Sequence, residues 1–286
     1  MHVPVMRAES LEYLAVRPDG IYLDATSGLG GHSAAIAREL TSGFVIANDR
    51  DAESLEMAKA NTSEYAARIR FHQGSFRDLK AALHAAGVEF VDGLLADLGV
   101  SRYQLTEPGR GFSFMAEGPL DMRMDRSQGS TADELVNYTR EQELADLIYR
   151  FGEERRSRRI ARAIVRARPI HGTGHLARVI EAAVPRTNKL HPATQTFMAL
   201  RLAVNDEQGE LDRLLESAPD LVKSGGRIVI ISFMSLEDRK IKQSFQALAR
   251  AGRASILTKH VVRPGREELN VNPPSRSAKL RAVEMR

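Results

Sequence analysis

The chain of 286 residues contains no cysteine, which excludes disulfides, thiolate zinc sites and cysteine nucleophiles. It also lacks any apolar run of about 18 residues, the length that a membrane-spanning helix needs. Its first residues, MHVPVMRAES, lack the apolar stretch of a signal peptide, so we expect a cytoplasmic protein without a membrane partner. No serine-histidine-aspartate or phosphate-loop signature is present. Nearby glycines make a helical metal site at His171 and His175 improbable, and no metal is expected.

The composition is that of a globular protein with a modest excess of positive charge. Hydrophobic residues make up 43% of the chain and charged residues 27%, which argues against whole-chain disorder and coiled coil. The length allows one large domain or two ordinary ones. The formal net charge is +4, and the basic residues are unevenly placed, which favours a polyanionic partner.

Short apolar strands alternate with helical patterns from residue 10 to about residue 103, as in a parallel sheet wound with helices. After that the pattern changes. Residues 104–130 predict an ordered loop, and only helical patterns follow from 131 to about 202. The predicted strands span residues 21–26, 44–49, 69–73, 91–98, 226–233, 254–262 and 278–285. The last two are expected to form an antiparallel edge.

This order predicts an α/β, Rossmann-like fold with an all-helical insertion. Residues 1–103 and 203–286 would form one discontinuous domain, and residues 104–202 the insertion.

A glycine-rich turn follows the first predicted strand, in the segment IYLDATSGLGGH. Glycines such as Gly28 and Gly30 let the backbone approach a ligand closely, and the next helix offers unpaired N–H groups. Asp49 follows about 20 residues later, where the ribose of an adenosine cofactor is usually held. Asp24 would repel a pyrophosphate but attract the sulfonium of S-adenosylmethionine (SAM), which favours a methyl donor over NAD. A tight turn without a ligand is the alternative.

Carboxylates end three of the predicted strands. Asp97 ends the fourth strand, at DLGVS, as Asp24 and Asp49 end the first two. Because the carboxyl ends of parallel strands meet at one edge of a sheet, these side chains are expected to lie together. Buried charge is costly without a partner, which favours a ligand site, although each could instead cap the following helix.

The most basic stretch is EERRSRRIARAIVRAR, at residues 153–168. At helical spacing, Arg155, Arg159, Arg162 and Arg166 share one face, and apolar residues occupy another. An arginine face backed by an apolar face suits a helix that packs on a core and binds nucleic-acid phosphates. A solvated helix face with internal ion pairs is the alternative.

A series of short motifs then identifies a family. They are HVPV (2–5), D-x-T-x-G-x-G-G-H-S (24–33), DRD (49–51), DLGVS (97–101), RGFSF (110–114), GPLDMRMD (118–125), GEER (152–155), RIARAIV (159–165), HPATQTF (191–197) and SLEDR (235–239). Together they closely resemble the bacterial small-subunit (16S) ribosomal RNA cytosine-N4 methyltransferases, the RsmH or MraW family. The resemblance covers nearly the whole chain, and GPLDMRMD and SLEDR are highly specific.

The resemblance implies a SAM-dependent methyltransferase sheet interrupted by a helical domain. Members of the family methylate the N4 amino group of a cytidine in the decoding region of small-subunit rRNA, on an assembled subunit, and release S-adenosylhomocysteine. The residues that would contact SAM are Gly30, Gly31, His32, Asp49, Phe76, Asp97 and Gln104. Met234 departs from the family, which usually has histidine there, so details of base or phosphate positioning can differ.

The expected reaction sets requirements for the site. Cytosine N4 is a poor nucleophile because its lone pair is delocalised, so a side chain must orient the amino group and accept its proton or hydrogen bond. The candidates are Asp97 and, in the LDMRMD segment, Asp121 and Asp125, with Arg123 on a phosphate. The sequence does not choose among the three carboxylates.

Three other functions stay open at this point. A nicotinamide-dependent oxidoreductase fits the fold but not Asp24 or the arginine helix. An amino-methyltransferase with another DNA or RNA target shares the chemistry, but an N-P-P-[YF] turn would be expected where DLGVS stands; the NPPS at 272–275 lies elsewhere. A non-catalytic SAM-binding ribosome-assembly factor is the third. The chain could be a monomer or a homodimer.

Overall fold

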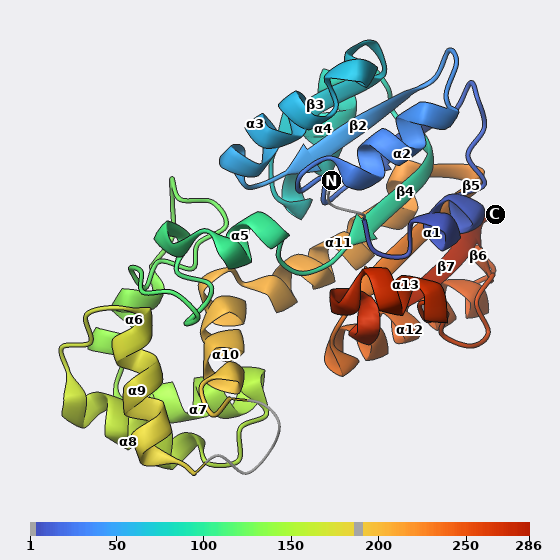
Figure 1. Cartoon of the computed structure of the whole chain (residues 1–286). Helices are drawn as coiled ribbons and strands as arrows, with labels where there is room; N and C mark the ends of the chain where they lie inside the picture. Colours follow the sequence, from blue (N-terminus) through green and yellow to red (C-terminus); the bar gives the residue numbers. More distant parts are fainter. Residues whose placement is uncertain (1–3, 186–190) are drawn as a thin grey trace. The chain divides into compact units, whose positions relative to one another are not determined.

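The computed structural model describes residues 4–185 and 191–286, which form two compact units (Figure 1). Unit 1 joins the chain up to Gly99 to Gln208–Arg286, and unit 2 is Val100–Glu207. The insertion therefore extends beyond the predicted 104–202 at both ends. Val100 and Val204 pack against the core of unit 2, which explains why the boundary falls outside them.

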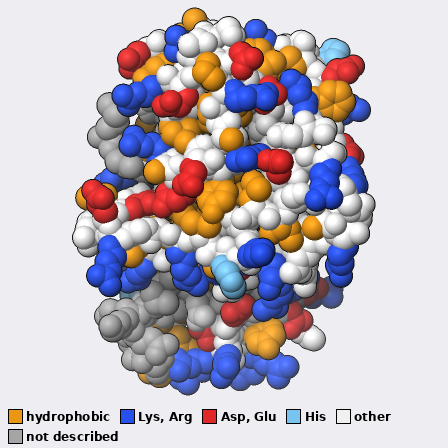
Figure 2. All heavy atoms as spheres, turned by 90° about the vertical axis from the view of Figure 1, so that its right-hand side faces the viewer, with side chains coloured by type: hydrophobic (Ala, Val, Ile, Leu, Met, Phe, Trp, Pro, Cys, Tyr) orange, Lys and Arg blue, Asp and Glu red, His pale blue; other side chains and the backbone are white. Residues whose placement is uncertain are grey.

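The surface carries many basic side chains, as the composition indicates. Lysine and arginine side chains are common on the face drawn in Figure 2, where acidic and hydrophobic side chains lie among them. Within the described residues, no helix combines the length and the apolar character needed to cross a membrane.

Unit 1 is built on a seven-stranded sheet of order β3-β2-β1-β4-β5-β7-β6. Its strands are β1 (Ile21–Asp24), β2 (Phe44–Asp49), β3 (Ile69–Gln73), β4 (Val91–Asp97), β5 (Val222–Ser232), β6 (Ala254–Ile256) and β7 (Lys279–Met285). Its helices are α1 (Arg7–Leu14), α2 (Gly31–Glu39), α3 (Ala52–Asn61), α4 (Leu79–Ala85), α11 (Glu207–Leu221), α12 (Ser235–Arg250) and α13 (Arg266–Val271), with 3-10 turns η1 (Ser63–Arg68), η2 (Phe76–Asp78) and η4 (Pro273–Ser277). This confirms the predicted α/β, Rossmann-like class.

The strand directions agree with the sequence, with one difference at the edge. β1 to β5 are parallel, and β7 lies antiparallel between β5 and β6. β6 is three residues long, shorter than the predicted 254–262. Beyond β6, the chain contacts β7 again at Val262, which exchanges backbone hydrogen bonds with Leu280 in an isolated bridge. The residues between Ile256 and Val262 are not part of a strand.

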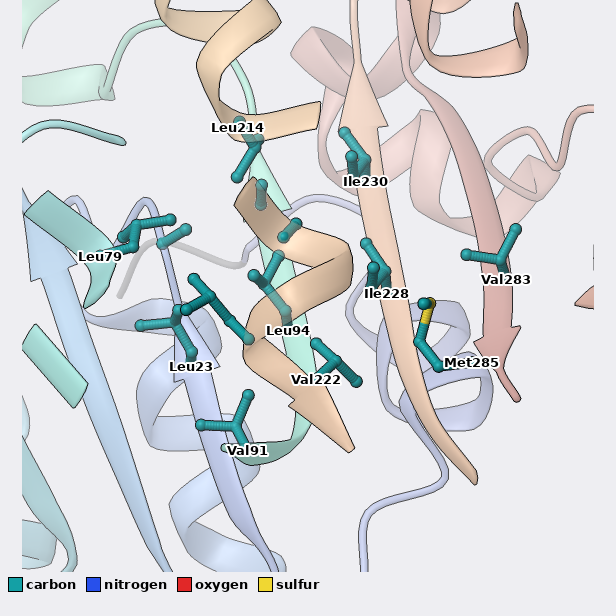
Figure 3. Close-up of a cluster of buried hydrophobic side chains, with 14 of the residues drawn as sticks. Leu23, Leu79, Val91, Leu94, Leu214, Val222, Ile228, Ile230, Val283 and Met285 are labelled. Atoms are coloured by element: carbon teal, nitrogen blue, oxygen red, sulfur yellow. The ribbon is translucent and has the colours of Figure 1, made fainter. Parts of the chain in front are cut away.

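Both faces of the sheet are covered, which explains why its central strands are uniformly apolar. One face packs under α1 and α2, with Tyr22, Leu95 and Ile231 buried beneath them. The other packs under α4, α11 and α12. Figure 3 shows this second cluster, in which Leu94 and Ile230 of the sheet lie with side chains such as Leu214 of α11.

Unit 2 is helical, as predicted. It contains α5 (Arg102–Thr106), η3 (Pro108–Arg110), α6 (Ala132–Tyr138), α7 (Glu141–Gly152), α8 (Ser157–Ala167), α9 (Thr173–Ala183) and α10 (Thr194–Val204). The predicted loop at 104–130 thus includes the rest of a short helix and one 3-10 turn. Its LDMRMD part is fastened by Asn205, whose side chain accepts from the Met124 N–H at 2.8 Å and donates to the Met122 carbonyl at 2.7 Å.

Candidate functional site

The glycine turn lies between β1 and α2 in unit 1. Gly30 has φ of +86°, and a side chain there would collide with Thr62, so the position requires glycine. The turn is closed by hydrogen bonds from the Ser27 N–H to the Asn48 carbonyl and from the Gly30 N–H to the Ser27 carbonyl, both 2.8 Å. It is therefore a defined backbone cradle at the start of α2.

Asp49 ends β2 and is bound to this turn. Its Oδ2 accepts the Gly28 N–H at 2.7 Å, and its Oδ1 accepts the Asp51 N–H at 2.9 Å. Burial raises the pKa of Asp49 to about 6, although both N–H groups oppose the shift. A ligand that donated hydrogen bonds to this carboxylate would stabilise its ionised form, and the ribose hydroxyls of an adenosine cofactor are such donors.

Asp24 ends β1 and is fully buried. Its Oδ2 accepts from the Ser33 hydroxyl at 2.6 Å, and its Oδ1 accepts from the Thr26 N–H at 3.2 Å. Burial raises the pKa of this carboxyl, while the charge of His32 and these hydrogen bonds oppose the rise. Asp24 thus holds the turn in place as well as adding negative charge.

Asp97 ends β4 and faces His32 of α2. The His32 Nε2 lies 3.6 Å from the Asp97 Oδ2. Within the described part of the chain, the buried His32 Nε2 and Asp97 Oδ1 have no hydrogen-bond partner. Burial acts to lower the pKa of His32, but the nearby carboxylate of Asp97 and the charge of Asp24 outweigh it, so the pKa is raised. Two buried polar atoms left open beside the glycine turn indicate a ligand that would satisfy them.

Strand alternation explains why these groups converge. Tyr22 and Leu95 belong to the cluster under α1 and α2, and Asp24 and Asp97 follow them by two residues on the same face. Thr26 links the two strand ends, since its side chain accepts the Asp97 N–H at 2.6 Å and its own N–H donates to Asp24. The expected gathering of carboxylates at this edge of the sheet is therefore observed.

Phe76, which was expected to contact SAM, also packs against the core of unit 1. Its side chain packs against the core under α4 and α11, and its N–H donates to the Glu210 Oε2 at 3.1 Å. Glu210 is buried and also pairs with Arg213 at 2.7 Å. Sequence reasoning missed Glu210, whose only signal was a carboxylate among the apolar positions of α11.

Four of the predicted residues lie in the first part of unit 2, before α6. Gln104 is buried and caps α5, its Oε1 accepting the Ser101 N–H at 2.9 Å. The side chain of Asp125 accepts from Ser127 and Gln128 next to it. Asp121 is paired with Arg123, whose Nε lies 2.7 Å from its Oδ1 and whose second nitrogen lies 3.1 Å from its Oδ2.

That ion pair involves the arginine that was expected to contact a phosphate. Burial acts to raise the pKa of Asp121, but the hydrogen bonds and charge of Arg123 outweigh it and hold the pKa below its usual range. Arg123 was expected to be available for a phosphate, yet its guanidinium already forms a two-pronged bond with Asp121. This pair could not be predicted from a sequence pattern, because it depends on the turn at Met122, where φ is +60°.

The arginine helix is α8, and its faces are as predicted. Ile160, Ala161 and Ile164 are buried, whereas the predicted arginines are exposed. Arg155 precedes the helix, which begins at Ser157. Arg162 lies 3.4 Å from Glu141, but the structure records no ion pair between a described residue and the other three, Arg155, Arg159 and Arg166.

Other sequence features have structural roles. Met234 precedes α12, and its N–H donates to the Glu237 Oε2 at 3.1 Å. The rings of His171 and His175 stack with centroids 5.7 Å apart, and the described residues contain no cluster of potential metal ligands. His191 packs on Phe114, with ring centroids 4.6 Å apart.

Comparison with known proteins gives matches over the whole chain. The model of the MraW methylase family matches residues 1–286. The ribosomal RNA small subunit methyltransferase H of Solibacter usitatus is 68% identical over 286 residues, which is 100% of both chains. The protein of that name from Acidobacterium capsulatum is 50% identical over 99% of this chain and 98% of its own. Among solved structures, an rRNA methylase from Streptococcus thermophilus aligns over 100% of this chain and 99% of its own, at 11% identity and a TM-score of 0.48.

Proposed function

Because this chain belongs to the MraW methylase family, we propose that it transfers a methyl group from SAM to the N4 amino group of a cytidine in the decoding region of small-subunit rRNA. The chain is a SAM-dependent methyltransferase, and its curated relatives carry the name of an rRNA small subunit methyltransferase. The structural observation that supports the proposal most directly is the pair of open buried atoms on His32 and Asp97. A ribosomal RNA substrate implies that the protein acts in the cytoplasm.

The residues of unit 1 fit SAM. The glycine turn lies directly before the start of α2, and Asp49, which is bound to that turn, offers a partly buried carboxylate to a ribose. Asp24 and Asp97 add negative charge nearby, which suits a sulfonium and opposes a pyrophosphate. The family resemblance implies that Gly31, His32, Phe76 and Gln104 also contact SAM, and we include them in the proposal.

When bound, SAM supplies a methyl group on a positively charged sulfur, ready for in-line displacement. The contribution of the chain is to orient the attacking nitrogen and to accept its proton. The open Oδ1 of Asp97 can accept a hydrogen bond from the cytosine amino group, which directs the nitrogen lone pair away from the carboxylate. Transfer would break the bond between the methyl carbon and sulfur as the new N–C bond forms, and the amino nitrogen would become acidic. The carboxylate of Asp97 would accept its proton.

Asp121 and Asp125 are the other proposed partners of the amino group. The ion pair with Arg123 keeps Asp121 ionised, so it can accept hydrogen bonds, but it leaves the carboxylate with fewer free acceptor sites than Asp97. We therefore assign the amino group to Asp97 first.

Unit 2 is proposed to recognise the RNA. The exposed arginines of α8 present a row of guanidinium groups on a helix that is fixed to the core by its opposite face. The target base must leave its stack or arrive unpaired to reach Asp97. The proposed partner is the small ribosomal subunit.

The proposal is tested with small subunits from a bacterial strain that lacks its own enzyme of this family. Subunits are incubated with the full chain and isotopically labelled SAM, and the rRNA nucleosides are analysed by mass spectrometry. Labelled N4-methylcytidine at one position of the decoding region is the expected result. Label on another nucleoside would support a different amino-methyltransferase, and SAM binding without label would support a non-catalytic assembly factor; either result contradicts the proposal.

A further inference from the structure

The connection between β6 and β7, residues 257–278, lies at the same edge of the sheet as the cofactor site. Lys279 begins β7 and pairs with Ser232, the last residue of β5. The carboxyl end of β5 lies beside that of β4, because Asp97 pairs with Ile231. The residues that lead into Lys279 are therefore at the Asp97 end of the sheet, within unit 1.

This connection is folded. In its first part, Val262 exchanges backbone hydrogen bonds of 2.9 and 3.1 Å with Leu280 of β7. Near its end, Ser275 is fully buried, and its hydroxyl donates to the Asn272 carbonyl at 2.7 Å. In the middle, the Oε1 of Glu268 accepts the Met6 N–H at 2.7 Å. Side chains on it are therefore held on a fixed backbone.

The same contact links the connection to the cofactor site. Pro4 lies over the start of α2, where a side chain on Gly31 would come within 3.2 Å of it. Glu268, bound to Met6 two residues further on, is close enough for its charge to act on His32. The connection therefore borders the part of the site that contains His32 and Asp97.

Basic side chains dominate the exposed surface of the connection. Lys259, Arg263, Arg266 and Arg276 are exposed, and the structure records no ion pair between them and any described residue. We call these four residues the β6–β7 cation surface. The same stretch has only two acidic residues: Glu268 is used by Met6, and Glu267 is exposed. Unpaired cations on a fixed backbone next to an active site favour a polyanion that must approach that site.

We propose that the β6–β7 cation surface binds the RNA backbone next to the target nucleotide, as a second RNA contact separate from α8. This rests on the proposed function, and it assigns RNA binding to the methyltransferase unit itself. Arginine guanidinium groups match phosphate oxygens in geometry, and their unpaired state removes the cost of breaking ion pairs in the protein. A strand held here has its phosphates beside the pocket while its base turns toward Asp97.

The test compares two double variants of the full chain that lose the same charge. Arg263→Gln/Arg276→Gln changes the surface, and Arg38→Gln/Arg250→Gln is the matched control. Arg38 and Arg250 are exposed in the last turns of α2 and α12, where the structure records no ion pair for them within the described residues. Because these helices follow β1 and β5, their last turns lie at the opposite edge of the sheet.

Affinity for fluorescently labelled oligocytidylate RNA is measured by anisotropy between 50 and 200 mM KCl, and SAM affinity by calorimetry. For the surface variant we expect about a tenfold weaker RNA affinity and a salt slope lower by about 1.4, which is ~0.7 for each lost single-strand phosphate contact. SAM affinity should be unchanged, which also shows that the variant is folded. The control should keep the RNA affinity of the unchanged chain within about twofold.

Equal RNA affinities and salt slopes for the two variants would overturn the inference. This outcome is distinguishable from failure of the proposed function, because RNA binding is read without methylation. A chain that binds RNA through this surface but leaves N4 of cytidine unmethylated would overturn only the proposed function.

Discussion

Three carboxylates at one edge of the sheet, one buried and two partly buried, differ in what their oxygens bind. Both oxygens of Asp24 accept from the turn, and both oxygens of Asp49 accept backbone N–H groups. Asp97 alone keeps a buried oxygen that no described residue binds. The first two thus shape the turn of the proposed cofactor site, and Asp97 has acceptor capacity left for the proposed substrate.

Replacing Asp97 by alanine should abolish methylation. The variant loses the acceptor that orients the amino group and takes its proton, so we expect kcat to fall by about 10²–10⁴-fold. The measurement is methyl transfer to small subunits from labelled SAM. Thermal unfolding serves as the control for folding. Activity near that of the unchanged chain would exclude Asp97 from the role given to it here.

The raised pKa of Asp49 predicts a pH dependence of SAM binding. The ionised carboxylate accepts hydrogen bonds from a ribose, whereas the protonated form accepts them poorly. Since burial raises the pKa of Asp49 to about 6, SAM affinity should fall as the pH drops through that value. Calorimetric titration of the chain with SAM between pH 5 and pH 8, a range that includes this pKa, measures the fall in affinity. In an Asp49→Asn variant, affinity should be low, and this step should be absent.

The raised pKa of Asp49 has the opposite effect on the stability of the ligand-free fold, which it favours at low pH. A carboxyl with a pKa higher in the folded than in the unfolded chain binds its proton more tightly when folded. Its contribution to stability is fully present below the ordinary value of 3.8 and is lost as the pH rises through about 6. At neutral pH, Asp49 therefore favours SAM binding at the expense of the free fold.

Individual side-chain partners were predictable only where the backbone pattern determines them. Strand ends could be found from apolar runs, and so Asp24, Asp49 and Asp97 could be placed together. The Asp121–Arg123 pair joins residues two apart in an irregular loop, and no periodic pattern describes that geometry. Glu210 could not be linked to Phe76 because they are far apart in the chain.

At the level of elements, the strands were easier to predict than their surroundings. Strands β1, β2 and β4 are largely buried on both faces, and their runs of apolar residues show where they lie. No element was predicted for residues 203–225, yet α11 ends at Leu221 and β5 begins at Val222. Pro219 and the glycines at 225 and 226 obscure both the end of the helix and the start of the strand. β6 was predicted too long because sequence pattern does not show where pairing stops.

The arginine face of α8 gives a prediction for the whole element. An Arg159→Gln/Arg166→Gln variant removes two exposed guanidinium groups and leaves the buried face of the helix unchanged. We expect KM for small subunits to rise about tenfold with kcat little changed, and the dependence of kcat/KM on salt to become weaker. Steady-state kinetics at several salt concentrations test this, with Arg38→Gln/Arg250→Gln as the control. A KM equal to that of the control would make α8 a solvated surface helix.

At the scale of the whole molecule, the residues proposed to bind SAM are mostly in unit 1. SAM at about 100 times its Kd should stabilise the unit that binds it by about 2.7 kcal/mol. Hydrogen exchange with and without SAM should therefore show added protection in the turn before α2 and at the ends of β2 and β4. Amides of α7 and α9 should change little. Equal protection of those helices would show that SAM binding orders both units together.

The discontinuity of unit 1 has a consequence for how the protein is made. Unit 2 is one continuous segment, whereas the sheet of unit 1 is complete only when β5, β6 and β7 have been added. During translation, β1 to β4 emerge first, and β4 then forms an open edge of the sheet. Unit 2 can fold before β5, the strand that pairs with β4, has been synthesised. Open strand edges favour pairing with other chains. Slow elongation between residues 100 and 222 would lengthen that exposure, so aggregation of nascent chains should depend on codon choice within the helical insertion.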